Sequence, residues 1–281
     1  MLRRFSSLVA PHVVVFGGNG WVGSSVCQAL LRQGAQVTAV SRSGRKSDEP
    51  WCDKVEWKLF DLNDNDDKTP LLALLSPGSS NSNDSNDSND SNDSNDSNDS
   101  NMHPVTGVVS CVGTFGDPPL DQESMFEQNG KVNAFLATSS KEAGVQHFAY
   151  ISAHQFPIAR DTVMKGYYRG KMHAEATIQS AGFQSSTILR PGFISGTRNG
   201  IPLWIAGTPM STIFRTTLME SVRAKVPNMV GDFLETPVDV ADVGVVAAMG
   251  ALGRMDQGGA YGDRSPLSGV EIARLAEQYA G

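Results

Sequence analysis

Residues 13–23 of this chain read VVVFGGNGWVG, and this stretch decides the fold class. The short β-branched run predicts a buried strand, and the apolar pattern that follows it predicts a helix. Between them, Gly17, Gly20 and Gly23 have the spacing of a turn that binds the pyrophosphate of a dinucleotide. In such a turn the first glycine makes the bend, the second admits the phosphates, and the third lets helix and strand pack closely.

The context of the glycines supports a dinucleotide site over an ordinary glycine-rich turn. The predicted strand precedes the glycines and the predicted helix, residues 24–32, follows them, as the motif requires. The N-terminus of a helix presents free N–H groups and a positive dipole end to phosphates. We expect Trp21 and Val22 to line the cofactor together with the three glycines.

The end of the second predicted strand, residues 36–40, bears on which dinucleotide binds. An NAD site usually has an acidic residue here, which accepts a hydrogen bond from the ribose hydroxyl. This chain has Arg42 instead, with Arg45 and Lys46 close behind. Arginine suits the extra phosphate of NADP. The sequence therefore favours NADP over NAD, although a solvated basic loop is the other interpretation.

Composition excludes several classes of function. The 281 residues are enough for one large α/β domain, and 40% of them are hydrophobic, which is ordinary for a globular protein. The net charge is −7, but six aspartates lie in one repeat, so the rest carries about −1 and gives no reason to expect nucleic acid. The three cysteines and five histidines have no disulfide or metal-ligand spacing. We find no apolar run that would cross a bilayer.

A low-complexity tract interrupts the chain before the fourth predicted strand. Residues 82–99 are six Ser-Asn-Asp triplets, flanked by Ser-Asn remnants. The tract has no apolar residue to bury, so residues 79–101 are predicted to be a disordered surface insertion. Calcium binding is disfavoured, because the glycine and closing glutamate of a calcium loop are missing.

Strands and helices alternate along the rest of the chain, which predicts a Rossmann-like, doubly wound parallel sheet covered on both faces. Residues 12–196 would form the dinucleotide-binding domain, and 197–281 a small substrate or lid portion that completes it. Residues 201–230, rich in Met, Ile and Phe, would form an apolar substrate pocket or simply pack in the core. Further strands are expected at 55–60, 105–112, 145–152 and 183–189, and further helices at 68–75, 123–143 and 165–181.

The first eleven residues have the composition of a transit segment. They contain two arginines and two serines, no acidic residue, and an apolar face at helical spacing. The early arginines favour mitochondria over plastids. A frayed basic N-terminus is the alternative.

Beyond the glycine turn, several motifs give the chain a family resemblance. It resembles the atypical, extended-type short-chain dehydrogenases/reductases, the epimerase/dehydratase-like proteins. The similarity narrows to the branch of the mitochondrial protein associated with the coenzyme Q biosynthetic complex, its plastid relatives, and the nucleotide-binding accessory subunit of complex I. The motifs are Asp61-Leu62, Cys111-Val112-Gly113, Asn133, Tyr150-Ile151-Ser152-Ala153, Gly166-Tyr167-Tyr168 with Lys171, 188–194 containing Arg190-Pro191-Gly192, 196–198 and 237–243.

The resemblance implies roles for particular residues. Tyr167 would be the acid/base, and Lys171 would lower the pKa of that tyrosine and hold the nicotinamide ribose. The i, i+4 spacing puts both side chains on one helix face. Ser152 would orient the substrate, although Ala153 and His154 occupy the place where the family has its serine or threonine. Further cofactor contacts are implied for Asp61, Leu62, Cys111, Gly113 and Pro191.

Two functions stay open at this point. The first is a mitochondrial NADP-dependent oxidoreductase that acts on a hydrophobic, quinone-related substrate. The second is a non-catalytic nucleotide-binding subunit or assembly factor of a mitochondrial complex, either complex I or the coenzyme Q synthesis complex.

Overall fold

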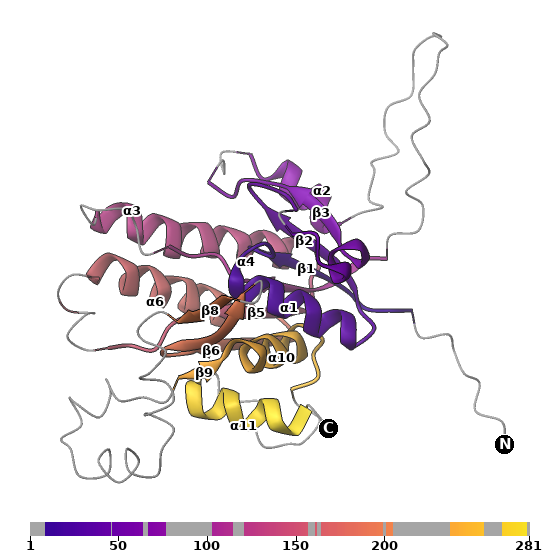
Figure 1. The fold of residues 1–281 in the computed structure, drawn as a ribbon. Coiled ribbons are helices and arrows are strands. Elements are labelled where there is room, and N and C mark those ends of the chain that lie inside the picture. The colour runs from indigo at the N-terminus through magenta and orange to yellow at the C-terminus, as the bar shows by residue number, and fades with distance from the viewer. Residues whose placement is uncertain are drawn as a thin grey trace, which may run out of the picture.

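A seven-stranded parallel sheet forms the middle layer of the protein (Figure 1). The structure is a computed structural model and describes residues 9–45, 47–63, 67–76, 103–114, 121–156, 161, 164–198, 201–204, 237–255 and 266–279. The strand order is β10-β6-β5-β4-β1-β2-β3, which confirms the predicted doubly wound sheet. The strands are β1 His12–Phe16, β2 Gln36–Ser41, β3 Glu56–Leu59, β4 Val105–Ser110, β5 His147–Ile151, β6 Ser185–Arg190 and β10 Leu267–Ser268.

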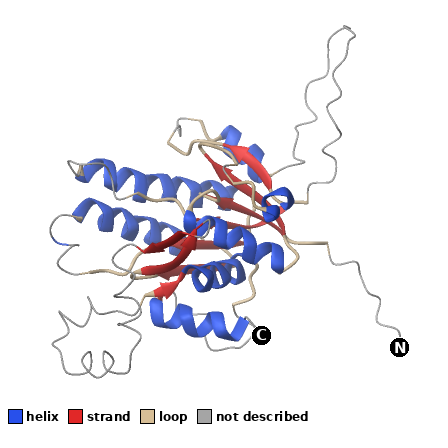
Figure 2. Cartoon of the chain, viewed as in Figure 1, coloured by secondary structure: helices blue, strands red, loops and turns tan. Residues whose placement is uncertain are grey.

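Helices cover both faces of this sheet (Figure 2). Alternate residues of β1 point to opposite layers: Val13 and Val15 belong to one apolar core, and Val14 and Phe16 belong to the other. Because both faces are buried, the strand is apolar at every one of these positions. The first core lies under α1 Trp21–Arg32, α10 Val240–Ala251 and α11 Gly269–Tyr279; the second lies under α2 Thr69–Leu75, α4 Val132–Glu142 and α6 Lys165–Ser180.

The helix predicted over 123–143 is interrupted by a π-helical segment. It begins as α3, Gln122–Phe126, passes through the π-helical turn η2, Glu127–Lys131, and continues as α4. At this turn Gly130 packs against α6 so closely that a Cβ on it would lie 2.8 Å from the Cα of Gly170. Such π-helical insertions occur often at functional sites.

The described C-terminal segments return to the N-terminal sheet. Leu267 of β10 pairs with Leu189 of β6 in parallel, and α10 packs on α1, where a Cβ on Gly244 would lie 2.4 Å from Ser25 Oγ. A second sheet, which the sequence analysis did not anticipate, has the order β8-β7-β9 and consists of β7 Ile194–Arg198, β8 Ile201–Trp204 and β9 Val238–Asp239. The substrate or lid portion expected over 197–281 stays a prediction, since most of 201–230 lies outside the described residues.

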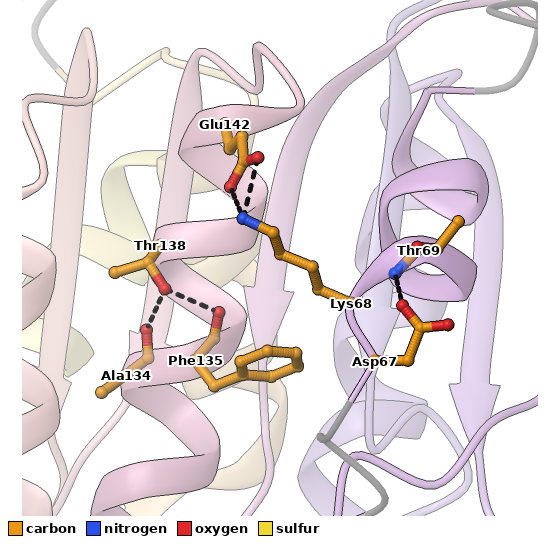
Figure 3. A network of polar contacts seen from close by, with 7 residues as sticks. All are labelled: Asp67, Lys68, Thr69, Ala134, Phe135, Thr138 and Glu142. Carbon is orange, nitrogen blue, oxygen red and sulfur yellow. Dashed lines mark hydrogen bonds and ion pairs between the residues drawn. The ribbon is translucent and has the colours of Figure 1, made fainter. Parts of the chain in front are cut away.

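Polar contacts tie the start of helix α2 to its surroundings (Figure 3). Asp67 accepts a hydrogen bond from the N–H of Thr69 at 2.8 Å, and Lys68 Nζ reaches the Glu142 carboxylate on α4 at 2.7 Å. At the other end, the Ser76 hydroxyl donates to a carbonyl oxygen just beyond α4. The insertion predicted over 79–101 lies outside the described residues, as do the first eight residues of the transit segment predicted over 1–11.

Candidate functional site

A cavity of about 380 Å³ opens at the carboxyl ends of β1–β4, where the strand order reverses. Open α/β sheets bind their ligands at this switch point. The cavity brings together many of the residues that the sequence analysis singled out for the cofactor. Those that line it are Gly17, Gly20, Arg42, Asp61, Leu62, Cys111 and Gly113, together with Asn19, Phe60, Val112, Thr114 and Gln128.

The glycine turn forms a cradle that side chains would fill. Gly17 has a φ of +79°, in the left-handed region that favours glycine, and a Cβ on Gly23 would lie 2.1 Å from the carbonyl oxygen of Gly17. Gly20 is the exposed N-cap of α1, and no side chain among the described residues caps that helix. The free N–H groups of the first turn therefore face the place where a pyrophosphate would sit, so the turn fits a dinucleotide.

Two predicted cofactor residues of the same turn point elsewhere. Trp21 lines a second cavity, and its indole N–H donates to the carbonyl oxygen of Thr197 at 3.3 Å. Val22 packs against the core. Pro191 is buried outside the lining of the cofactor cavity, and its carbonyl oxygen accepts a hydrogen bond from the His154 N–H.

One of the predicted basic residues reaches the cavity from the loop after β2. Arg42 is exposed and lines it, whereas Arg45 pairs with Asp53 at 2.7 Å and is not part of the lining. Lys46 lies outside the described residues. The Asn19 amide donates to the carbonyl oxygen of Gly44 at 2.6 Å, which ties the glycine turn to this loop.

Lys171 lies directly behind the opposite end of the cavity. A Cβ on Gly113 would be 3.0 Å from its Nζ, which donates to the carbonyl oxygen of Ile151 at 2.9 Å. Nζ is also 4.8 Å from the centre of the Tyr150 ring. Burial lowers the pKa of Lys171 to about 8. Burial also raises the pKa of the Cys111 thiol to about 12, so this lining group is not a reactive thiolate.

Tyr167 lies one helical turn before Lys171, but its pKa shift is opposite to the one that the family resemblance implied. Lys171 Nζ is 5.8 Å from the centre of the Tyr167 ring. The tyrosine is 7% exposed and packs with Met125 and Tyr168. Burial raises the pKa of Tyr167 well above its usual value. Desolvation of the phenolate is the largest cause of this shift, and the role of Lys171 towards the tyrosine stays a prediction.

Ser152 makes a structural contact on α6. Its hydroxyl donates to Glu175 at 2.5 Å, and Glu175 forms an ion pair with Arg190 of β6. Ser152 is buried and is not part of the lining of the cavity. His154, in the place where the family has its serine or threonine, stacks edge-on against Phe156 at 4.8 Å between ring centres.

The sequence analysis missed a residue that holds the floor of the cavity. Asn129, in the π-helical turn, accepts a hydrogen bond from the N–H of Thr114 and donates to its carbonyl oxygen at 2.8 Å. Next to it, Asn133 accepts a hydrogen bond from the Ser110 hydroxyl at 2.6 Å. These amides hold the loop that carries Gly113. The signal in the sequence was two asparagines and a glycine inside a predicted helix, a combination that lowers helix propensity.

Other kinds of site find no support in the described part of the chain. No group of three or more His, Cys, Asp or Glu side chains gathers there in a way that would hold a metal ion. No described helix has both the length and the apolar composition of a membrane span.

Comparisons with curated proteins give organellar relatives. Over 210 residues the chain is 34% identical to an uncharacterized chloroplastic protein of Arabidopsis thaliana, covering 73% of this chain and 59% of that relative. It is 29% identical to MIOREX complex component 2 of Saccharomyces cerevisiae, covering 66% and 73%. Over 93 residues it is 36% identical to the mitochondrial protein fmp-52 of Neurospora crassa, covering 33% and 38%. The chain thus spans about three fifths of the first of these relatives.

Solved structures and family comparison agree on the fold. The Bordetella bronchiseptica enzyme WbmH, in complex with NAD⁺, superimposes with a TM-score of 0.53 at 16% identity, covering 87% of this chain and 73% of that one. At this identity the likeness shows the fold. Residues 13–203 match the family described as the NAD dependent epimerase/dehydratase family. With the glycine cradle at the switch point of a parallel sheet, this match establishes that the chain belongs to the NAD dependent epimerase/dehydratase family.

Proposed function

We propose that the protein is an NADP-dependent oxidoreductase of mitochondria that reduces a hydrophobic, quinone-related substrate. The observation that carries the proposal is a single cavity that contains the glycine cradle, Arg42 in the loop after β2, and Gly113 with Lys171 behind it. The bound cofactor would supply hydride, and the chain would supply binding, orientation and a proton.

Arg42 supports NADP as the cofactor. Its guanidinium lines the cavity at the strand end where an acidic residue would select NAD. Asp61, the nearest acid in the lining, follows β3 and accepts hydrogen bonds from the N–H and the side-chain amide of Asn63. The solved structure of WbmH contains NAD⁺, so the proposed preference for NADP rests on the loop of this chain alone.

Tyr167 and Lys171 support the proton-transfer role. A tyrosine whose pKa is raised by burial stays protonated at neutral pH and can donate to an oxygen that gains charge. Lys171, held at the ends of β4 and β5 by carbonyl oxygens of Val112 and Ile151, is placed to bind a ribose hydroxyl next to Gly113.

The surroundings of Tyr167 support an apolar substrate. Met125, Tyr168, Ala153 and Met164 pack around it. Phe156 and Phe193 form an aromatic pair in the neighbouring loops, with ring centres 5.2 Å apart. An apolar and aromatic environment of this kind suits a flat, hydrophobic ring such as that of a quinone. The basic N-terminal segment and the mitochondrial and chloroplastic relatives support an organelle.

A second candidate function is a non-catalytic dinucleotide-binding subunit of a mitochondrial complex. Two observations favour it: the Ser152 hydroxyl is engaged by Glu175, and the chain is similar to a protein named as a complex component. In that case the bound cofactor would stabilise the chain within an assembly by mass action.

One variant pair separates the two candidates. NADPH oxidation is measured with a short-chain quinone, using the whole protein, Tyr167→Phe and the neighbouring Tyr168→Phe. The oxidoreductase predicts turnover that falls at least about 100-fold in Tyr167→Phe, with NADPH affinity nearly unchanged and Tyr168→Phe close to wild type. NADPH binding without turnover in the wild type, together with recovery in a large complex from mitochondria, would instead favour the subunit.

A further inference from the structure

A second cavity, of about 420 Å³, has a lining that differs from that of the cofactor cavity in all but one residue. Its walls come from α1, from the segment around the 3₁₀ turn η1 (Pro50–Lys54), from β7 and from the start of α10. Asn19 lines both cavities. The proposed oxidoreductase function makes no use of this space.

Aromatic surface dominates one part of the wall. Trp21, Trp51 and Trp57 all line it, and the rings of Trp51 and Trp57 are tilted by 50° with centres 6.0 Å apart. Each indole N–H is already engaged by the protein: Trp21 donates to a carbonyl of β7, Trp51 to Glu49 at 2.6 Å, and Trp57 to the carbonyl oxygen of Cys52. The indoles therefore offer the cavity π-surface and carbon rather than hydrogen-bond donors.

The charged side chains of the wall are carboxylates, and Asn19, Gln28 and Ser47 add neutral polar side chains that can also donate. Glu49 and Asp239 line the cavity, and no Lys or Arg is among the described residues that do so. The hydroxyl of Ser24 donates to the carbonyl oxygen of Trp21, and that of Ser25 donates to the carbonyl oxygen of Val240. Because both hydroxyl protons are donated to backbone carbonyl oxygens, these two side chains can only accept hydrogen bonds from a ligand.

The positive end of the helix dipole at the start of α10 would favour an anion, but two acidic side chains of the same helix end offset it. Asp239 caps the helix by accepting the Ala241 N–H at 2.8 Å, and Asp242 lies in the first turn. Both carboxylates oppose the positive end of the helix dipole. A wall with three indoles, whose charged side chains among the described residues are carboxylates, matches the chemistry that recognises ammonium groups.

We propose that this cavity binds a small organic cation, either a quaternary ammonium or a protonated amine. The tryptophan rings would hold the alkyl groups and their spread positive charge, and Glu49 would supply the compensating carboxylate. The site is separate from the dinucleotide cavity, so its test does not depend on the oxidoreductase function.

The tryptophans supply the readout. Three of the four tryptophans of the chain line the cavity, so the full-length protein can be titrated with choline chloride while its intrinsic fluorescence is recorded. Saturation-transfer NMR on the choline methyl protons runs in parallel, and sodium chloride at equal concentration controls for ionic strength. The neutral isostere 3,3-dimethyl-1-butanol has the same shape without the charge.

We expect saturable choline binding and binding of the neutral alcohol that is at least about tenfold weaker, because the attraction is to the charge. Glu49→Gln keeps an amide oxygen for the Trp51 N–H and should weaken choline binding at least about fivefold, with NADPH affinity unchanged. Glu142→Gln removes a carboxylate from α4, outside the cavity, and should bind choline like the wild type. No saturable binding by either method, equal binding of the alcohol, or an unchanged Glu49→Gln affinity would each overturn the proposal.

Discussion

The two sides of the cofactor cavity hold basic side chains in opposite environments, one exposed and one buried. Arg42 is exposed in a loop after β2, while Lys171 is buried behind Gly113 among the carbonyl oxygens that end β4 and β5. An exposed guanidinium stays charged at little cost, so it can select a cofactor without affecting the fold. Burying an amine lowers the free energy of unfolding, and several strands and helices are needed to hold the amine in place. We therefore expect the loop that carries Arg42 to tolerate substitution better than the buried surroundings of Lys171 do.

The largest effect is expected from closing the cradle that joins the two sides. Gly20→Val places methyl groups where the phosphates would approach, and it should weaken NADPH binding by more than about 100-fold. The fold should survive, because Gly20 has an extended backbone, with φ −73° and ψ 168°, and is exposed. Calorimetric titration measures the affinity, and thermal unfolding checks the fold. Unchanged NADPH affinity would remove the glycine turn from the site and would count against both candidate functions.

The second largest effect on cofactor affinity is expected at Arg42, on the exposed side of the cavity. Arg42→Asp removes a charge-assisted contact to the ribose phosphate, and NADPH affinity should fall by about 1.5–3 kcal/mol, while NADH affinity should not fall. Arg45→Ala is the matched control, because Arg45 pairs with Asp53 and does not line the cavity. Titration with both cofactors measures the effect. The proposed preference would be contradicted if NADPH and NADH bound with equal affinity and the Arg42 substitution changed neither affinity.

On the buried side of the cavity, Lys171 should make the free energy of unfolding depend on pH. The folded pKa of Lys171 is lowered to about 8 from 10.5, so between these values the unfolded chain binds a proton that the folded chain does not. The free energy of unfolding contributed by this residue therefore rises with pH across that window. Lys171→Met should be more stable than the wild type near pH 7, on the order of 1–3 kcal/mol, and the gap should narrow by pH 9.5. Chemical denaturation at the two pH values measures it, and a gap that does not change with pH would refute the assignment.

The smallest effect is expected from the repeat. Deleting residues 82–99 should shift the melting temperature by no more than about 2 °C and leave NADPH affinity unchanged, because the tract has no apolar side chain to bury. The flanking helix α2 is anchored independently through Lys68 and Ser76. Replacing the tract with eighteen Gly and Ser residues is the control for chain length. A large loss of stability in the deletion that the replacement restores would mean that the length of the tract matters.

Local patterns in the sequence were sufficient to predict the fold. Glycines at 17, 20 and 23, flanked by an apolar run and an amphipathic run, are a short-range signal, and the described turn has the geometry that they predict. The alternation of strands and helices predicted the parallel sheet for the same reason, since each element's periodicity is visible within about ten residues. Small differences occur at the ends: α1 begins at Trp21 rather than at residue 24.

The candidate site was only partly predictable, because its contacts join residues far apart in the chain. Nothing near Ser152 in the sequence indicates that its hydroxyl meets Glu175 and Arg190. The π-helical turn that aims Asn129 at Thr114 depends on the close packing of Gly130 against α6. The second sheet pairs β7 with β9, which lies some forty residues further along the chain.

The sequence by itself determined the layered α/β fold, the place of the glycine cradle, and the arginine in the loop after β2, because each depends on neighbouring residues and their period. The tertiary structure alone decided the ionisation of the buried groups. Tyr167 and Lys171 are spaced as the family requires, yet burial raises the pKa of the tyrosine and lowers that of the lysine. Desolvation depends on what other segments place around a side chain, and a linear pattern does not contain that information.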